Sequence, residues 1–248
     1  MIYHPLASIL ISTLEQKVIR YSKDFIELGH IQSSTGTAER FASIAVSTLA
    51  KSIKQEISKK FQGTLFTSTI LNTLEEDKCG NRPSRLLFNP IDSFTNLSRS
   101  ISNFGISFLF QEDSGKGVQN IFSILYSFQS QEIIYCDGKT IDIRGRNLKP
   151  VIRKNHKFCV LASNTEGLKN QAILQKFGTN IATTSLVFDT YSLAKGKIDA
   201  INYSNAPLVQ VAPCQMVANA MLFNANPVEI IIDKTLEKQT CDIFWVAR

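Results

Sequence analysis

The stretch that decides the fold runs from Leu87 to Ser107, LFNPIDSFTNLSRSISNFGIS. It opens within the apolar run from Arg85 to Phe88, which is typical of a strand, and continues into Asn89-Pro90-Ile91-Asp92-Ser93. The acidic run Leu74-Glu75-Glu76-Asp77 precedes the same strand. This separation lets the two polar segments converge on one pocket, although a Glu-Glu-Asp run alone is more often a turn at the surface.

Two amphipathic helices are expected before this stretch. Pro5 suits a first helical position, and apolar residues then recur every three or four positions until the helix ends near Leu28-Gly29. A second helix is indicated by apolar residues four apart from Phe41 to Phe61, with lysines on its other face and Gly63 closing it.

The middle of the chain is predicted to form an antiparallel sheet. Residues typical of turns connect its strands at Glu112 to Gly117 and at Asp137-Gly138, which suits hairpins. The short apolar runs that predict strands are Arg85 to Phe88, Phe104 to Phe110, Ile121 to Phe128 and Glu132 to Cys136.

Beyond about Pro150 strands and helices alternate. Strands are expected at Lys157 to Ala162, Ile198 to Tyr203, Val228 to Ile232 and Cys241 to Val246. Helices are expected at Thr165 to Phe177, Ser185 to Ala194 and Leu208 to Phe223. We therefore predict an α+β fold in two interlocked parts: residues 1–150 with the N-terminal helices and the antiparallel sheet, and residues 151–248 with the alternating part.

Composition limits the class of protein. The 248 residues are 44% hydrophobic, which allows a sizeable core, and 27 basic against 21 acidic residues give a net charge of +6. Only 19% of residues are charged, against roughly 25% in a typical domain. The five cysteines are scattered, which favours reduced thiols. No apolar run is long enough to span a bilayer and no secretory signal begins the chain, so we expect a cytoplasmic protein without membrane contact.

Three general functional schemes find little support. The histidines, His4, His30 and His156, lie in no recognisable nucleophile motif. The phosphate-binding loops GxxxxGK[ST] and GxGxxG are absent, and Ser114 to Gly117 is better explained as a hairpin turn. Because the basic residues lack interleaved aromatic residues, no specific nucleic-acid site is expected.

The opening stretch resembles the signature of the inositol monophosphatase family, D-P-[IL]-D-G-T-x-N-F followed by P-x-[FW]-A-[VI]-S. Leu74-Glu75-Glu76 falls at the family's G-E-E. Ser185, Asp189 and the run from Ala194 to Ala200 resemble its G-S-A-A-L-D-L-x-x-V-A-x-G-R-x-D-A. Gln210-Val211-Ala212 stands where the family has W-D-[IV]-A, and Asp24 to Ala45 tracks the segment that ends in D-F-V-T-x-x-D. This resemblance covers essentially the whole chain and implies the layered αβαβα sandwich of inositol monophosphatases and sugar phosphatases.

The family hydrolyses phosphomonoesters with two or three Mg²⁺ ions, which lower the pKa of the attacking water and stabilise the leaving alkoxide. The resemblance implies that Glu75, Asp92 and the carbonyl of Ile91 bind metal, with Glu75 orienting the water. Thr95 joins Glu75 and Asp92 as a catalytic candidate. The positions implied at the substrate are Ser93, Asn96, Ser185 and Tyr203.

Four acids of the family pattern are replaced in this sequence. Asn89 stands for the first aspartate of D-P-I-D and Gln210 for the aspartate of W-D-I-A. Val46 stands for the aspartate ending D-F-V-T-x-x-D, and Tyr203 for the glutamate that contacts the sugar ring. Ser93-Phe94 also replaces the G-T pair. Restoring the four acids would raise the acid count from 21 to 25 and lower the net charge from +6 to +2, so much of the positive balance reflects their loss.

Two function classes follow. The first is a Mg²⁺-dependent phosphatase of a small phosphorylated polyol, in which Asn89 and Gln210 serve as degenerate metal positions. Its Mg²⁺ binding is expected to be weak or absent and its catalysis weakened or lost, which makes the chain a candidate pseudoenzyme.

The second is a non-catalytic protein-binding module, like the bacterial extragenic-suppressor proteins of the family, which are partners of the transcription machinery. Glu75 and Asp92 would then be structural hydrogen-bond acceptors or hold one weak cation. The family resemblance also implies a homodimer.

Overall fold

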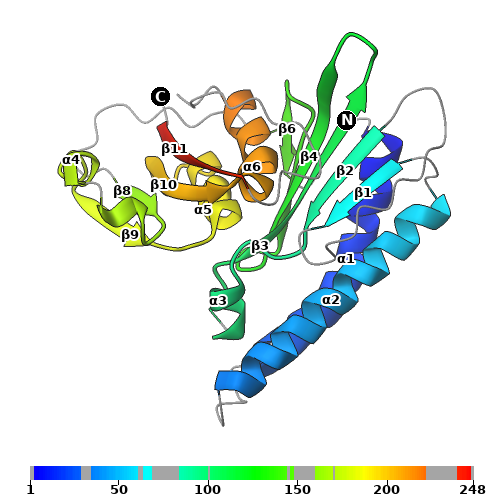
Figure 1. Ribbon diagram of the computed structural model, residues 1–248, viewed down its shortest axis with the longest axis horizontal. Coiled ribbons are helices and arrows are strands. Elements are labelled where there is room, and N and C mark those ends of the chain that lie inside the picture. Colours follow the sequence, from blue (N-terminus) through cyan, green and yellow to red (C-terminus); the bar gives the residue numbers. More distant parts are fainter. Residues whose placement is uncertain are drawn as a thin grey trace.

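Two long helices begin the chain and lie side by side across one face of a large sheet (Figure 1). The computed structural model describes residues 3–28, 35–60, 64–68, 84–99, 101–143, 146–147, 160–169, 171–221 and 239–246. Helix α1 covers Pro5–Leu28 and helix α2 covers Thr35–Lys60. Both predicted helices are confirmed. No helix in these ranges is long and apolar enough to cross a membrane.

In the part of the chain that the structure describes, the first sheet has seven strands in chain order. All neighbouring strands are antiparallel except β1 and β2, which are parallel. The predicted hairpins are therefore confirmed, while the parallel pair and the short strands β1, β6 and β7 were not predicted. The strands are β1 (Thr64–Ser68), β2 (Ser84–Asn89), β3 (Gly105–Asp113), β4 (Val118–Ser127), β5 (Glu132–Cys136), β6 (Ile141–Ile143) and β7 (Arg146–Asn147).

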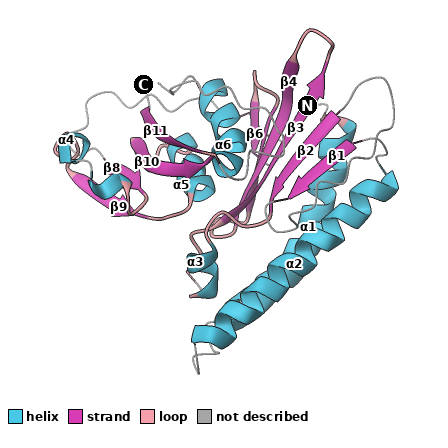
Figure 2. Ribbon diagram, in the orientation of Figure 1, coloured by secondary structure: helices cyan, strands magenta, loops and turns pink. Residues whose placement is uncertain are grey.

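Among the described residues, the second sheet has four strands in the order β11-β10-β8-β9. Strand β8 is Val160–Ser163, β9 is Thr179–Ala182, β10 is Ala200–Pro207 and β11 is Thr240–Val246. Strand β8 pairs in parallel with both β9 and β10, and β11 pairs antiparallel with β10. This sheet is mixed, and β9 is its outermost strand beside β8 (Figure 2).

Helices α5 (Leu186–Ala194) and α6 (Leu208–Ala220) lie between the two sheets (Figure 1). Their residues share one apolar cluster with both sheets, through Leu87 and Leu125 of the first and Ile201 and Trp245 of the second. A short helix, α3 (Phe94–Ser98), follows β2. The chain thus packs helices, sheet, helices and sheet in successive layers, as the predicted α+β fold requires.

Successive side chains of the first sheet point alternately to its two faces, and each face contributes to its own apolar cluster. Leu86 and Phe88 of β2 face the cluster that includes α1 and α2, whereas Leu87 between them faces the cluster that includes α5 and α6. Strands β3 and β4 divide in the same way, because successive strand side chains point to opposite faces. Because this sheet is covered on both faces, strands β3 and β4 are buried over most of their length.

The prediction of one helix from Thr165 to Phe177 is wrong. Only a 3-10 turn, η1 (Gly167–Lys169), and one helical turn, α4 (Gln171–Leu174), form there, and the unpredicted strand β9 follows. A tertiary contact overrides helix propensity here, because Asn202 Nδ2 donates to Gly167 O at 2.9 Å. A local bond from Gly167 N to Asn164 Oδ1 also competes with helix formation. The predicted strand Val228 to Ile232 lies outside the described residues.

Candidate functional site

Asp92 sits in a cradle of hydrogen-bond donors between the first sheet and helix α5. Its Oδ1 accepts from Gly105 N at 2.8 Å, and its Oδ2 accepts from Ser185 Oγ and Val187 N, each at 2.7 Å. The residue is only 5% exposed. A carboxylate offers about four lone pairs, so most of its acceptor capacity is used by the protein itself.

Two of these donors come from the N-terminus of α5. Ser185 is its N-cap, since the Ser185 hydroxyl accepts from Phe188 N at 3.1 Å, and the same hydroxyl donates to Asp92. The Val187 amide adds a second bond from the first turn. Helix N-termini attract anions because their free amides and the helix dipole both favour negative charge. Asp92 is therefore the internal anion at this helix end.

Burial sets the protonation of Asp92. Removal from water raises its pKa from 3.8 to about 6, although the bonds from Ser185, Val187 and Gly105 oppose the shift. The donors thus compensate part of the desolvation cost of a buried charge. A Mg²⁺ cluster would supply that compensation from cations, whereas here uncharged donors of the chain supply it.

Gln210 lies beside Asp92, in the first turn of α6, and its amide nitrogen donates to the main-chain carbonyl of Asp92 at 3.1 Å. An ionised aspartate at this position could not make the bond, because it has no hydrogen to donate. Gln210, which the resemblance aligns with an aspartate, therefore links α6 directly to the Asp92 main chain.

Tyr203 points into a second buried polar group with Asp189 and Thr183. The Tyr203 hydroxyl donates to Asp189 Oδ2 at 2.7 Å, and Thr183 Oγ1 donates to the same oxygen. Asp189 is fully buried, and burial raises its pKa from 3.8 to about 7. Its Oδ1 has no hydrogen-bond partner among the described residues. Tyr203 is 3% exposed, and its hydroxyl donates its hydrogen bond to Asp189 within the protein.

The predicted substrate positions Ser93 and Asn96 meet the loop between β9 and α5. Ser93 Oγ lies 3.2 Å from Thr184 Oγ1, and Asn96 Nδ2 donates to Thr183 O at 2.8 Å. Thr184 has φ +58°, a strained value for a β-branched residue, and it stands at the glycine of the G-S motif. Both predicted polar side chains are thus engaged within the protein.

Phe94 and Thr95 begin helix α3 and are exposed, with Phe94 40% accessible. They do not share the buried surroundings of Asp92. The sequence pattern placed Thr95 among the catalytic candidates, and the structure places its side chain at the surface.

The remaining predicted positions are separated. Asn89 ends β2, is 1% exposed and lies opposite Ser107 of β3. Ile91 and Val46 are buried in the cluster that includes α1 and α2. Glu75 lies outside the described residues. Within the described ranges, no three His, Cys, Asp or Glu side chains come together as a metal-binding group.

The described residues do not fit a cluster of two or three Mg²⁺ ions. Mg²⁺ requires oxygen ligands, preferably carboxylates, in near-octahedral geometry. Asp92 has about one free lone pair, and Gln210 turns its amide nitrogen towards Asp92. The described groups around Asp92 are joined to it by hydrogen bonds.

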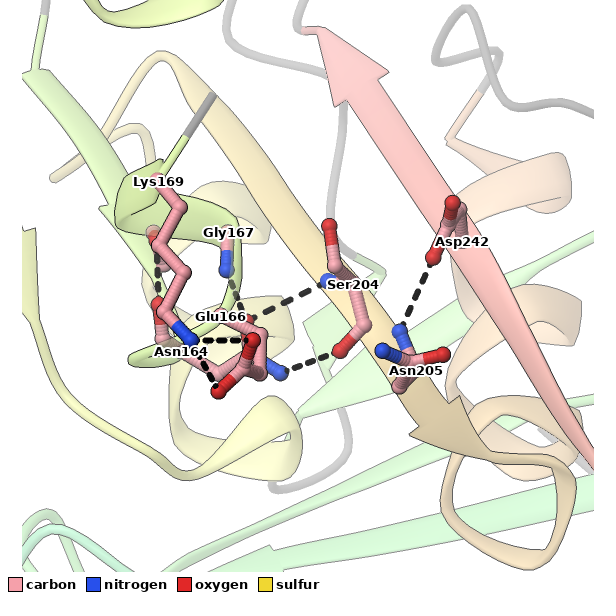
Figure 3. Close-up of polar contacts among 8 residues, drawn as sticks. Asn164, Glu166, Gly167, Lys169, Ser204, Asn205 and Asp242 are labelled. Atoms are coloured by element: carbon pink, nitrogen blue, oxygen red, sulfur yellow. Dashed lines mark hydrogen bonds and ion pairs between the residues drawn. The ribbon is translucent and has the colours of Figure 1, made fainter. Parts of the chain in front are cut away.

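Asn164 was missed by sequence reasoning and joins β8 to β10. Its Oδ1 accepts from Gly167 N and Ser204 N, and its Nδ2 donates to Ser204 O at 2.8 Å (Figure 3). Gly167 is required there because a Cβ would lie 2.3 Å from Asn202 O. An asparagine three residues before a glycine, directly after a strand, was the available signal.

Similarity to solved structures extends over the whole chain. Comparison of the sequence with protein-family models and with curated proteins gave no match. The structure of inositol monophosphatase II from Staphylococcus aureus MSSA476 superposes with a TM-score of 0.74 and 15% identity, covering 99% of this chain and 92% of that chain. The extragenic suppressor protein suhB from Bartonella henselae gives 0.70 and 16%, covering 96% and 92%.

An extragenic suppressor from Pyrococcus furiosus gives a TM-score of 0.70 at 15% identity, covering 98% of this chain and 94% of that chain. At these identities the likeness establishes the arrangement of the elements and leaves activity to the residues themselves. The resemblance first seen in Leu87 to Ser107 is therefore matched in three dimensions: the chain has the inositol monophosphatase fold.

Proposed function

We propose that this protein is an inositol-monophosphatase-like protein in which hydrogen bonds replace the catalytic cation cluster, so that phosphomonoesterase activity is weakened or lost. The observation that carries the proposal is the cradle of Asp92, whose carboxylate accepts bonds from Gly105, Ser185 and Val187. A family aspartate retained in sequence serves here as an internal acceptor.

Charge supports the same conclusion. Phosphoryl-transfer sites hold several cations close together, which requires several nearby carboxylates to offset their repulsion. Asn89, Gln210 and Val46 carry no charge. Asp189 is buried nearby, but it accepts bonds from Tyr203 and Thr183. Any remaining activity towards a small phosphorylated polyol would rest on Asp92 and Glu75 with weakly held Mg²⁺.

The test is phosphate release from inositol 1-phosphate and from a generic phosphomonoester at millimolar Mg²⁺. The natural protein should release phosphate no faster than Asp92→Asn, which removes the one described carboxylate at the site. Turnover that depends on both Mg²⁺ and Asp92 would contradict the proposal.

The double variant Asn89→Asp/Gln210→Asp returns two carboxylates to the site. It should bind Mn²⁺ more tightly than the natural protein, because added negative charge favours a divalent cation. A matched control, Asn120→Asp/Gln119→Asp, adds the same charge on exposed positions of β4 and should leave Mn²⁺ binding unchanged.

A second candidate is a non-catalytic protein-binding module that acts on the transcription machinery. Its support is Phe94, a 40% exposed aromatic side chain directly after Asp92-Ser93, where the family pattern has a small polar pair. Exposed aromatic residues are enriched at protein interfaces. Binding of purified RNA polymerase to the natural protein, lost in Phe94→Ser, would support it. Equal binding by both proteins, or none at physiological salt, would count against it.

A further inference from the structure

Tyr3 and His4, directly before helix α1, contact four neighbouring strands of the first sheet. The Tyr3 hydroxyl donates to Asp142 Oδ1 of β6 at 2.6 Å, and the Tyr3 ring meets the Tyr135 ring of β5 edge-on, with centroids 4.8 Å apart. His4 packs against β3 and β4. Because Tyr135 belongs to the apolar cluster that includes α1 and α2, these contacts lie on the helix-covered face. We call Tyr3 and His4 the N-terminal clasp.

His4 occupies the N-cap position of α1. Its main-chain carbonyl accepts the first bond of the helix, from Ser8 N at 3.0 Å, and its Nδ1 accepts from Leu6 N at 3.2 Å. A capping side chain accepts from the second or third amide of the helix in this way, and the usual caps are serine, threonine, aspartate and asparagine. An imidazole can replace them only while its Nδ1 carries no proton.

The surroundings of the His4 ring favour its neutral form. The ring packs over Phe110 of β3 and Phe122 of β4, at centroid distances of 5.2 and 5.3 Å. Burial lowers the pKa of His4 below its ordinary 6.5, and the carboxylate of Glu112 on β3 opposes this shift. The neutral ring is the form that can accept the bond from Leu6.

Several elements place titratable groups around the clasp. Glu112 acts on the His4 ring through its charge, and Tyr135 hydrogen-bonds to the His4 main chain. Strand β4 contributes the uncharged Phe122. The titratable groups that face Tyr3 or His4 are Glu112 of β3, Tyr135 of β5, Asp142 of β6 and Glu15 of α1.

We propose that His4 is an acid-sensitive cap of α1, whose protonation at Nδ1 removes the acceptor of the Leu6 amide and releases the N-terminal clasp. The step adds one proton from water to the ring and breaks one hydrogen bond. The imidazolium then lies at the positive end of the helix dipole, which disfavours a cation. Without its cap, the first turn of α1 no longer holds Tyr3 firmly against β6.

The direction of the pH response follows from the lowered pKa of His4. The capped form is complete above about pH 6.5, the ordinary pKa, and is lost as pH falls through the lower pKa of the folded protein. Asp189, whose pKa is raised, changes the stability of the whole protein in the opposite direction. A measurement local to the clasp therefore distinguishes the two groups.

The experiment is nuclear magnetic resonance of the full chain from about pH 4.5 to about pH 8, a range that spans histidine titration. The chain has three histidines, and His4→Asn identifies the His4 imidazole signal by removing it. The His4 pKa should lie below 6.5. Exchange of the Leu6 amide, corrected for its intrinsic pH dependence, should accelerate at least about threefold as pH falls through that pKa. Amides in the centre of β4 should not lose protection.

Variants separate the cap from a merely structural role. His4→Asn keeps an acceptor that does not titrate and should hold the Leu6 amide protected at every pH, whereas His4→Ala should leave it exchanging fast throughout. Glu112→Gln should lower the His4 pKa further, because it removes the opposing charge. Its matched control, Glu166→Gln, removes an exposed carboxylate paired with Lys169 and should leave the His4 pKa unchanged.

Three results would each overturn the proposal. The first is a His4 pKa at or above 6.5. The second is protection of the Leu6 amide that does not follow the titration of His4. The third is the same pH response of this amide in His4→Asn as in the natural protein.

Discussion

At the scale of single residues, Asp92 is the position on which the account depends. A motif can keep an aspartate while its role changes, because the donors around the carboxylate decide whether it is available to a cation. Here those donors are two main-chain amides and the Ser185 hydroxyl. Through these bonds, the residue that matches a metal ligand of the family pattern joins β3 to α5.

Asp92→Asn tests this role through stability. The variant loses the charge that three donors share and turns an NH₂ group towards at least one of them. We expect the free energy of unfolding to fall by about 2–4 kcal/mol, since bonds to charged groups are the stronger ones. Urea denaturation measures the change. Asp113→Asn, at a turn where the carboxylate accepts from Gly115 N, is the control and should shift stability by less than about 1 kcal/mol.

Asp189 predicts a pH dependence. Its pKa in the folded protein, about 7, lies above the ordinary 3.8, so the folded state holds the proton more tightly than the unfolded state. Stability from this group is full below about pH 4 and is lost as pH rises through about 7, a difference of about 4 kcal/mol. Asp92, with a pKa of about 6, acts in the same direction.

Unfolding free energies measured from pH 4 to pH 7 check this. The natural protein should lose stability across that range, and Asp189→Asn should flatten the loss because amide nitrogen does not titrate. The idea fails if the slopes of the natural protein and of Asp189→Asn agree, with Asp113→Asn again controlling for the removal of one acid.

At the scale of elements, the Asp92 cradle requires close packing of β3 against α5. A Cβ on Gly105 would lie 2.3 Å from Val187 Cγ1 and 2.7 Å from Tyr126 O. No side chain fits there, so glycine lets the Gly105 and Val187 amides reach the same carboxylate.

Gly105→Ala should therefore destabilise the protein by about 1–3 kcal/mol. The added methyl group would clash with Val187 and with the main-chain oxygen of Tyr126, and a main-chain atom cannot easily move aside. Gly115→Ala is the contrasting variant: that glycine has φ +76° but no atom near its Cβ, so it should cost only about 1 kcal/mol through backbone strain. Chemical denaturation distinguishes the two, and equal losses would contradict the packing argument.

Elements with a strong periodic signal were predictable from sequence. Helix α1 and the hairpins of β3, β4 and β5 follow from local spacing and turn residues, and all are present. Strand β9 was not predictable, because four exposed residues carry no alternation and are held only by pairing with β8. The helix predicted from Thr165 to Phe177 does not form, because Gly167 bonds to Asn202, a residue distant in sequence.

At the scale of the whole molecule, the chain has the inositol monophosphatase fold, while four acids of the family pattern are replaced in its sequence. The resemblance pointed to Asp92, Ser185, Gln210 and Tyr203. The sequence could not show that Ser185 and Gln210 both donate hydrogen bonds to Asp92. Which acceptor a side-chain donor points at depends on how the helices and strands pack together, and the sequence alone does not fix that packing. Four of the six excess positive charges correspond to the acids that the family pattern has and this chain lacks.

The most direct test of the central claim is a Mn²⁺ titration of the full chain, followed by electron paramagnetic resonance of free Mn²⁺. If hydrogen bonds have replaced the cation cluster, the protein should bind at most one Mn²⁺ weakly, with a Kd near or above about 1 mM, which stabilises it by less than about 1 kcal/mol at about 1 mM ion. Two or more Mn²⁺ ions bound with micromolar affinity, and lost in Asp92→Asn, would contradict the account.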